Sequence, residues 1–353
     1  MRSALCSVLL CGVAFGAAAQ EPGEREVTFE ESPQVTVTGF AVGSASYDRA
    51  QLANSFTAGK LALSLFKPAG DAYLFGQLTT ALEGGEAATE IDNLIVSWTP
   101  ATASRWTVAF GRFDAPIGFE RDDEPLNFIA TNSFNFAFAR PSKLTGAIVR
   151  LTASPRLELA AGAGDGWNVA VDNNRAKTAL LRAQWLPVDG FTIGVTGLYG
   201  PERDSTDGHQ RSLLSPDLTL ELGRLVVGAE LNIGRERAAG GNLTWAGGAA
   251  TGFLRLGRRI GLAARYDHLS DTGGALTGTP QVLRSITVGP MWFYSQAREG
   301  IFSNIEHTTF HLPQIALRAA LRVDYSTQPF FETASGGPER SDTRAIVELV
   351  YLF

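Results

Sequence analysis

The sequence predicts an all-β fold, a transmembrane, antiparallel, up-and-down β-barrel of about 16 strands, within a range of about 14–18. Three observations indicate this fold. Segments of about ten residues alternate apolar and polar side chains, and the links between them are alternately short and long. Hydrophobic residues make up 44% of the chain, yet no stretch beyond the N-terminus reaches the roughly 18 apolar residues of a membrane helix. A membrane protein without such a helix must close its strands into a barrel.

Residues 1–19 have the pattern of a secretory signal peptide. Arg2 supplies the basic start, an apolar core follows, and Ala17-Ala18-Ala19 gives the small residues of a cleavage site. The apolar core is too short to cross a bilayer as a helix. A lipoprotein signal at Cys11 is the alternative, but Leu10 stands where that signal needs a small residue.

The predicted mature chain is one domain. Residues 20–33 form an acidic periplasmic N-terminal tail, and residues 34–353 form the transmembrane β-barrel. Both cysteines leave with the signal, so the exported chain must be stable without disulfides. Removal of Arg2 leaves 29 basic residues against 36 acids, a net charge of −7 that makes nucleic acid a poor partner.

The C-terminal segment TRAIVELVYLF shows the alternation most clearly. Arg344 and Glu348 share one face of the expected strand, and Val347 and Leu349 share the other. A two-sheet sandwich also alternates, but arginine recurring on the second face of many segments favours a barrel around water. The predicted strands cover residues 34–46, 56–66, 72–82, 91–99, 105–113, 144–153, 157–164, 176–186, 191–199, 212–222, 224–234, 242–256, 259–269, 282–295, 309–326 and 343–353.

The links support this strand count independently. Short ones such as 68–70 and 154–156 alternate with long polar ones, as expected for periplasmic turns and extracellular loops. Residues 296–308 break the rule, because this link is long where a short turn is expected.

Aromatic residues mark the expected strand ends. Tyr351 and Phe353 end the last strand on its apolar face, a pattern that resembles the C-terminal signature of outer-membrane barrels. We expect them to form the assembly signal for the barrel-assembly machinery. Interfacial girdles are expected from other aromatic residues near strand ends: Trp98, Trp106, Trp185, Tyr199 and Tyr325.

Three stretches resemble one known family. They are GRFDAPIGFE at 111–120, FNFAFARPSKLTGAIVR at 134–150 and GDGWNVAVDNNRAKT at 164–178. Together they are similar to the putative beta-barrel porin-2 (OmpL-like) family of outer-membrane proteins, chiefly over residues 105–200. The resemblance implies a porin-like barrel in the Gram-negative outer membrane, and it implies no catalytic residues.

The longest predicted link, residues 114–143, is the candidate for a loop that folds into the barrel and narrows the pore. In general porins the third extracellular loop does this, and the present link has the same ordinal position. A solvated surface loop is the alternative. The charged residues proposed for the constriction are Asp114, Glu120, Arg121, Asp122, Asp123 and Glu124.

Arginines on the polar faces of predicted strands are the candidates for the pore wall, opposite the acidic loop. Fixed charges of opposite sign would set a field across the pore and orient polar solutes. The alternative is that a wet lumen merely tolerates these arginines. The candidates are Arg150, Arg182, Arg265, Arg318 and Arg322.

Enzymatic and metal sites are poorly supported. His268 and Ser270 share one face of a strand, as in outer-membrane phospholipases, but no asparagine follows where a catalytic triad would need it. His307 and His311 have a spacing that on a strand does not form a zinc site. Asp165 with Asp172 offers an incomplete calcium set, so a polar turn is preferred. We therefore expect no enzyme, no metal and no cofactor.

The sequence thus predicts a porin-like channel for passive diffusion of small hydrophilic solutes across the outer membrane. The expected partners are outer-membrane lipid, the barrel-assembly machinery, the solutes and further copies in a homotrimer. Two alternatives remain open at this point. One is a closed structural or adhesive barrel whose loops bind a partner, and the other is a phospholipase-like enzyme.

Overall fold

The computed structural model describes residues 34–83, 86–203, 206–238, 240–296 and 313–353. The predicted signal peptide (1–19), the acidic tail (20–33), the irregular link at 296–308, and His307 and His311 lie wholly or almost wholly outside these residues. Among the described residues, no helix is long and apolar enough to cross a bilayer.

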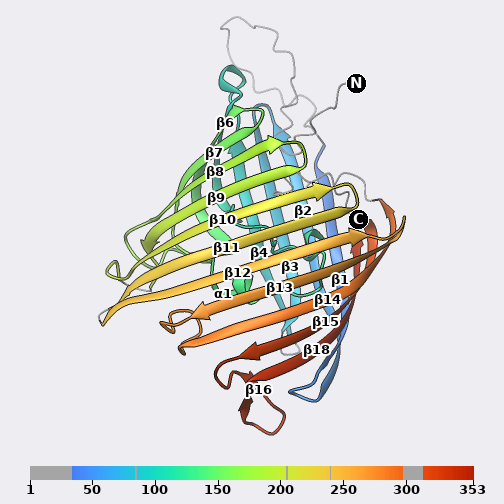
Figure 1. Ribbon diagram of the computed structural model, residues 1–353. Helices are drawn as coiled ribbons and strands as arrows, with labels where there is room; N and C mark the ends of the chain where they lie inside the picture. The colour runs from blue at the N-terminus through green and yellow to red at the C-terminus, as the bar shows by residue number, and fades with distance from the viewer. Residues whose placement is uncertain (1–33, 84–85, 204–205, 239, 297–312) are drawn as a thin grey trace, which may run out of the picture.

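The described chain forms a closed, antiparallel barrel of sixteen strands, which confirms the predicted fold class and strand count (Figure 1). Each strand pairs with its neighbours along the chain, and β1 pairs with β18 to close the barrel. The strands are β1 (Thr36–Asp48), β2 (Ala53–Ala69), β3 (Ala72–Glu83), β4 (Glu86–Trp98), β5 (Trp106–Asp114), β6 (Lys143–Ser154), β7 (Leu157–Gly164), β8 (Thr178–Val188), β9 (Phe191–Pro201), β10 (Gln210–Leu222), β11 (Leu225–Ala238), β12 (Gly241–Arg255), β13 (Ile260–Asp271), β14 (Gln281–Gln296), β15 (Pro313–Ser326) and β18 (Ser341–Leu352).

The barrel has an apolar outer face and a polar inner face. On β15, Leu317 and Leu321 are 43% and 49% exposed on the outside, whereas Arg318 and Arg322 are buried on the inside. The same alternation on β13 turns Tyr266 outward and Asp267 inward. Because successive side chains of a strand point to opposite faces, one sequence pattern builds both surfaces. An apolar exterior around a polar interior is the arrangement that a bilayer requires.

Most links at one end of the barrel are short, apart from residues 297–312 after β14, and several long links lie at the other end. Between β2 and β3 only Gly70 and Asp71 form the turn, and Gly70 adopts a φ of +61° there. At the opposite end, the link between β15 and β18 holds a two-stranded hairpin, β16 (Phe331–Glu332) with β17 (Pro338–Glu339). Most of the short and long links that alternate in the sequence therefore lie at opposite ends of the barrel. The hairpin of β16 and β17 was not predicted.

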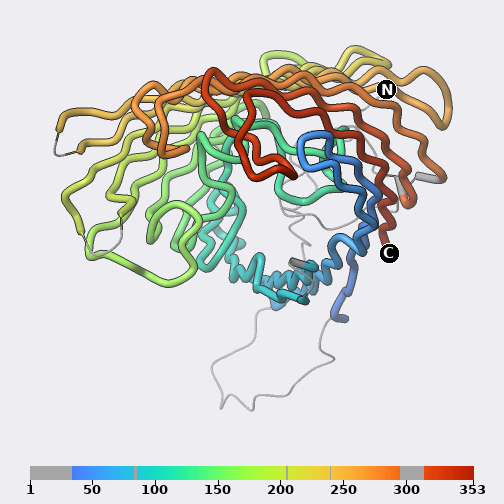
Figure 2. The backbone as a smooth tube through the Cα atoms, turned by 90° about the horizontal axis from the view of Figure 1, so that it is seen from below, coloured from blue at the N-terminus to red at the C-terminus, as the bar shows by residue number. Residues whose placement is uncertain are grey.

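The longest link, residues 115–142 between β5 and β6, lies inside the barrel and is called the inner loop from here on. Seen along the barrel in Figure 2, the green inner loop lies within the ring of strands. It contains the short helices η2 (Glu124–Leu126) and α1 (Phe134–Phe138), and α1 contacts β12, β13 and β14. Neither helix was predicted, because segments this short carry no periodic signal.

Phe353 contributes directly to barrel closure. Its backbone N–H donates to Gly39 O at 3.0 Å, and Gly39 N donates to Phe353 O at 2.9 Å. Its ring packs over Gly39, where an added Cβ would lie 2.8 Å from the ring. The ring also lies beside Tyr351, with 6.0 Å between centroids. We therefore retain the proposal that Tyr351 and Phe353 form the assembly signal.

Deletion of Phe353 should lower the fraction of protein that assembles, because it removes two closing hydrogen bonds worth about 1 kcal/mol each and the aromatic cover of Gly39. The folded, heat-modifiable band on a gel measures this fraction. Phe353→Tyr keeps the ring and the backbone and should assemble normally. Undiminished assembly of the truncated chain would contradict the proposed role.

Candidate functional site

The inner loop enters the barrel through the Pro-Ile-Gly turn at residues 116–118. Thr196 Oγ1 on β9 donates a hydrogen bond to Pro116 O at 2.9 Å. Gly118 has a φ of +71°, in the left-handed region that favours glycine. An added Cβ at Gly118 would lie 2.0 Å from Glu230 Oε2. The turn therefore needs glycine both for its backbone conformation and for its close approach to the wall.

Glu230 on β11 is the main anchor of the inner loop. Its Oε2 accepts hydrogen bonds from the N–H groups of Phe119 (2.6 Å) and Glu120 (3.1 Å). Its Oε1 accepts from Asn135 Nδ2 (2.7 Å) and Arg140 Nε (3.2 Å). Glu230 is 2% exposed, and a carboxylate this buried is stable only with such partners. One wall residue thus holds both ends of the loop.

The wall carries glycine where the loop lies closest to it. The Phe119 ring occupies the space beside Gly228, where an added Cβ would lie 2.2 Å from ring carbons. Asn135 Oδ1 would lie 2.2 Å from a Cβ added to Gly247. The absence of side chains at these inward positions lets the loop pack directly onto the strand backbone.

Glu120 and Arg265 join the middle of the loop to β13. Arg265 Nη1 lies 2.9 Å from Glu120 Oε1, and the N–H of Ser133 donates to the same oxygen at 2.8 Å. Ser133 is the N-cap of α1, since its hydroxyl accepts from Phe136 N at 2.9 Å. Asp267 Oδ1 accepts from Phe134 N at 3.0 Å. The structure therefore brings together two predicted site residues, Glu120 and Arg265, in one buried ion pair.

Arg318 and Arg322 on β15 lie beneath the loop and do not line open water. Arg318 donates to Glu124 O at 2.7 Å and pairs with Glu348. Arg322 Nη1 donates to Asn132 O at 2.5 Å, and its Nε lies 2.7 Å from Asp324. These side chains use their N–H groups to hold loop carbonyls, which the sequence did not indicate.

The acids that remain on and beside the loop surround lysines. Lys143 Nζ lies 2.8 Å from Asp92 and 3.1 Å from Asp122, and it also pairs with Asp114. Oxygen atoms of these three aspartates lie within 4.8 Å of one another, a spacing that suits a metal ion, but the Lys143 ammonium lies among them. Glu124 pairs with Lys60 at 3.3 Å. Two lysines thus stand among four carboxylates and offset part of the negative charge of the predicted acidic constriction.

Asp123 is held by an amide instead of a cation. Gln77 Nε2 on β3 donates to its two carboxylate oxygens at 3.1 and 3.3 Å. Burial, together with repulsion from Asp114, raises the pKa of Asp123 to about 8. At neutral pH this side chain is therefore mostly protonated and contributes little charge.

Arg150, Arg182 and Arg121 lie apart from the acids of the loop. Arg182 on β8 forms a bidentate pair with Asp217, at 2.7 and 3.2 Å. Arg150 on β6 lies 3.9 Å from Glu158. Arg121 is half-buried on the loop, and within the described parts of the chain its guanidinium has no hydrogen bond or ion pair.

The other sequence candidates occupy ordinary positions. His268 and Ser270 lie on the outer face of β13, opposite Arg284 and Val282 of β14. Asp165 and Asp172 both pair with Lys177, the former at 3.1 Å, so a lysine ammonium lies where calcium was considered.

Several residues of the site were missed by sequence reasoning. They include Glu230, Asp267, Asn135, Lys60 and the aromatic cover of α1, in which Phe331 packs 6.3 Å from Phe134 and Phe330 packs 6.4 Å from Phe138. The available signal was the position of Glu230 and Asp267 on the polar face of their strands.

Gly118→Ala should free the inner loop, because the new methyl group clashes with Glu230 as well as straining the backbone. Gly70→Ala is the matched control, since Gly70 has nearly the same φ (+61°) but open space at its Cβ position. Both variants should lose about 1–2 kcal/mol through strain, and Gly118→Ala about 1–3 kcal/mol more. Tryptic cleavage after Arg121 in the folded barrel measures loop release. Equal protection of the two variants would show that the turn is not an anchor.

Comparisons with solved structures show that the barrel fold is shared with known porins. The fold is similar to OmpT of Vibrio cholerae, at 10% identity and a TM-score of 0.63 over 90% of this chain and 97% of OmpT. An anion-selective porin from Comamonas acidovorans gives 11% identity and a TM-score of 0.63 over 91% and 99% of the two chains. OmpF of Salmonella typhi, in complex with daunomycin, gives 12% identity and a TM-score of 0.59 over 90% and 97%.

A comparison with curated proteins gave no match. The sequence of residues 28–353 matches the family described as putative beta-barrel porin-2, OmpL-like. This match spans the inner loop and all sixteen barrel strands. The chain therefore belongs to the putative beta-barrel porin-2, OmpL-like family of outer-membrane β-barrels.

Proposed function

We propose that the protein is a porin that lets small hydrophilic solutes diffuse passively through its lumen. The observation that carries this proposal is a polar inner wall that the inner loop covers only in part. Away from Glu230, the side chains of Arg150 and Glu158 are 18% and 19% exposed on the inner face of β6 and β7. Charged side chains that reach water inside a barrel support a wet passage beside the loop.

We infer that the inner loop narrows this passage and fixes its width. Its main anchors lie on β11, β13 and β15 through Glu230, Arg265 and Arg318. Further contacts join it to Lys60 on β2, Gln77 on β3 and Thr196 on β9. The covered wall therefore runs along those strands, and the passage runs along the wall that includes β6–β8. Of the predicted constriction residues, Arg121 is the one that the described chain leaves without a partner.

Single-channel recording in planar bilayers tests this function. Purified protein should give stepwise conductance in potassium chloride, and Gly118→Ala should widen or destabilise the steps because it frees the inner loop. A folded barrel that gives no steps would be a closed structural or adhesive barrel. Hydrolysis of bilayer lipid by pure protein would indicate an enzyme. Either result would contradict the porin proposal.

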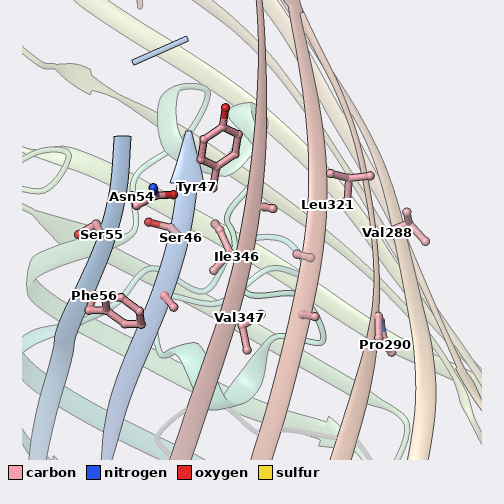
Figure 3. Close-up of a pocket in the computed structure, with 14 residues that line it drawn as sticks. Ser46, Tyr47, Asn54, Ser55, Phe56, Val288, Pro290, Leu321, Ile346 and Val347 are labelled. Atoms are coloured by element: carbon pink, nitrogen blue, oxygen red, sulfur yellow. The ribbon is translucent and has the colours of Figure 1, made fainter. Parts of the chain in front are cut away.

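We further propose that copies of the protein associate as a homotrimer through the outer face of β1. OmpT of Vibrio cholerae is described in a trimer form. Small side chains flatten the outer face over β1, β15 and β18, and a groove of about 600 Å³ runs there between Phe56, Leu321 and Val288 (Figure 3). The small residues are Gly39, Ala41, Gly43, Ala45, Ala319 and Ala345.

Ala45→Trp should dissociate the trimer, because the large ring would occupy the flat contact face. Ala246→Trp, on the exposed outer face of β12, is the control and should leave association unchanged. Sedimentation equilibrium in detergent gives the mass of each assembly. A wild-type monomer would contradict the proposal.

A further inference from the structure

The inner loop carries five consecutive charged residues, Glu120 to Glu124, and its four acids are all engaged. Glu120 pairs with Arg265 on β13 at 2.9 Å. Asp122 pairs with Lys143 at 3.1 Å, and Glu124 pairs with Lys60 at 3.3 Å. Asp123 is buried against Gln77. The negative charge that the sequence places in the constriction is therefore bound to fixed partners.

Arg121 differs from these neighbours. Its backbone is fixed, because its N–H donates to Asn127 Oδ1 at 3.0 Å and its carbonyl accepts from Asn127 Nδ2 at 2.7 Å. Its guanidinium makes no hydrogen bond and no ion pair within the part of the chain that the structure describes. The residue is half-buried, on a loop that lies within the ring of strands.

The charged groups with the largest effect on the pKa of Arg121 are two other arginines. Burial and the repulsion of Arg140 and Arg182 lower the pKa of Arg121, although Asp217 and Asp114 oppose this. Arg140 and Arg182 already have carboxylate partners, Glu230 and Asp217. An arginine stays charged at any physiological pH, so a positive charge with unused donors stands in the lumen.

A guanidinium has five N–H donors in a planar fork that matches the two oxygens of a carboxylate or phosphate. A positive charge fixed in a lumen raises the local potential for an anion and disfavours a cation. Arg121 is thus placed on a fixed backbone, with free donors, in the passage that solutes would share with the loop.

We propose that Arg121 determines the selectivity of this channel and transiently binds small oxyanions, carboxylates or phosphate, as they pass. This inference rests on the proposed porin function and names its solute class. It also runs against the bias that an acidic loop would suggest, because the acids are held by fixed partners and the Arg121 guanidinium is not.

Reversal potentials across a bilayer in a potassium chloride gradient test the selectivity. The wild type should prefer chloride, and Arg121→Gln should lower the chloride-to-potassium permeability ratio about fivefold, the factor that roughly 1 kcal/mol between unit charges in water represents. Arg235→Gln removes the same charge from the exposed outer face of β11 and should leave the ratio unchanged. Arg121→Lys should keep the ratio, because it keeps the charge.

Block of the chloride current by oxyanions tests whether they bind to the planar guanidinium of Arg121. Millimolar succinate and inorganic phosphate, added separately, should reduce the wild-type current, and both Arg121→Gln and Arg121→Lys should weaken this block. Block by one anion alone identifies which oxyanion the site takes. A cation preference in the wild type, or selectivity and block unchanged in Arg121→Gln, would overturn the proposal.

Binding in detergent separates this site from the porin function. Equilibrium dialysis with radiolabelled phosphate and succinate needs no conduction, and the wild type should bind at least one of them more tightly than Arg121→Gln. Binding that depends on Arg121 in a protein without conductance would overturn the porin proposal but support the site. Conductance without any such binding would contradict the proposed oxyanion site at Arg121 and would leave the porin proposal standing.

Discussion

The buried carboxylate of Glu230 is the constraint on which the interior depends. Inside a barrel wall a carboxylate at 2% exposure is unfavourable unless donors surround it. Here four donors come from the inner loop: two backbone N–H groups after Gly118, the Asn135 amide and the Arg140 guanidinium; the Asn232 amide on β11 adds a longer contact at 3.5 Å. The loop therefore supplies the hydrogen bonds that the buried carboxylate needs, and the carboxylate in turn fixes the loop to the wall. Loss of either partner would leave the other with a buried, unpaired charge, at a cost of about 3–5 kcal/mol.

The same principle explains how charge is distributed in the lumen. A barrel in lipid must place its polar residues inside, but an interior filled by a loop cannot leave those residues solvated. Arg265, Arg318 and Arg322 are consequently bound to loop carbonyls and carboxylates. Lys60 and Lys143 pair with Glu124 and Asp122 of the loop, and Lys143 also pairs with Asp92 on β4. Paired charges stabilise the loop, and an unpaired charge such as Arg121 remains to act on solutes.

The fold could be predicted from the sequence because a membrane barrel requires apolar and polar side chains to alternate along each strand. The alternation of Leu321 with Arg322 fixes which face meets lipid, and the same rule applies along each strand. Turns such as Gly70-Asp71 mark the strand ends. The length and ordinal position of residues 114–143 suggested a loop inside the barrel, but a solvated surface loop remained an equal alternative in the sequence.

The partners inside the barrel could not be predicted. Alternation tells which face Glu230 occupies but not what lies 111 positions earlier in the chain, at Phe119. That contact depends on the closure of sixteen strands and on the path of an aperiodic loop. The sequence did carry one unused signal: glycines such as Gly228 and Gly247 stand at inward positions, where strand interiors usually carry side chains.

The central claim is that the inner loop is docked on β11 inside the barrel. A double variant with Phe119→Cys and Gly228→Cys tests it most directly, because the Phe119 ring lies over Gly228 and the predicted mature chain has no other cysteine. Mild oxidation of the folded barrel should join the two cysteines, and tryptic digestion after denaturation should then give two peptides that stay linked until reduction. Adding Glu230→Ala should sharply reduce the cross-link. A folded barrel that forms no cross-link, or forms it equally without Glu230, would contradict the account.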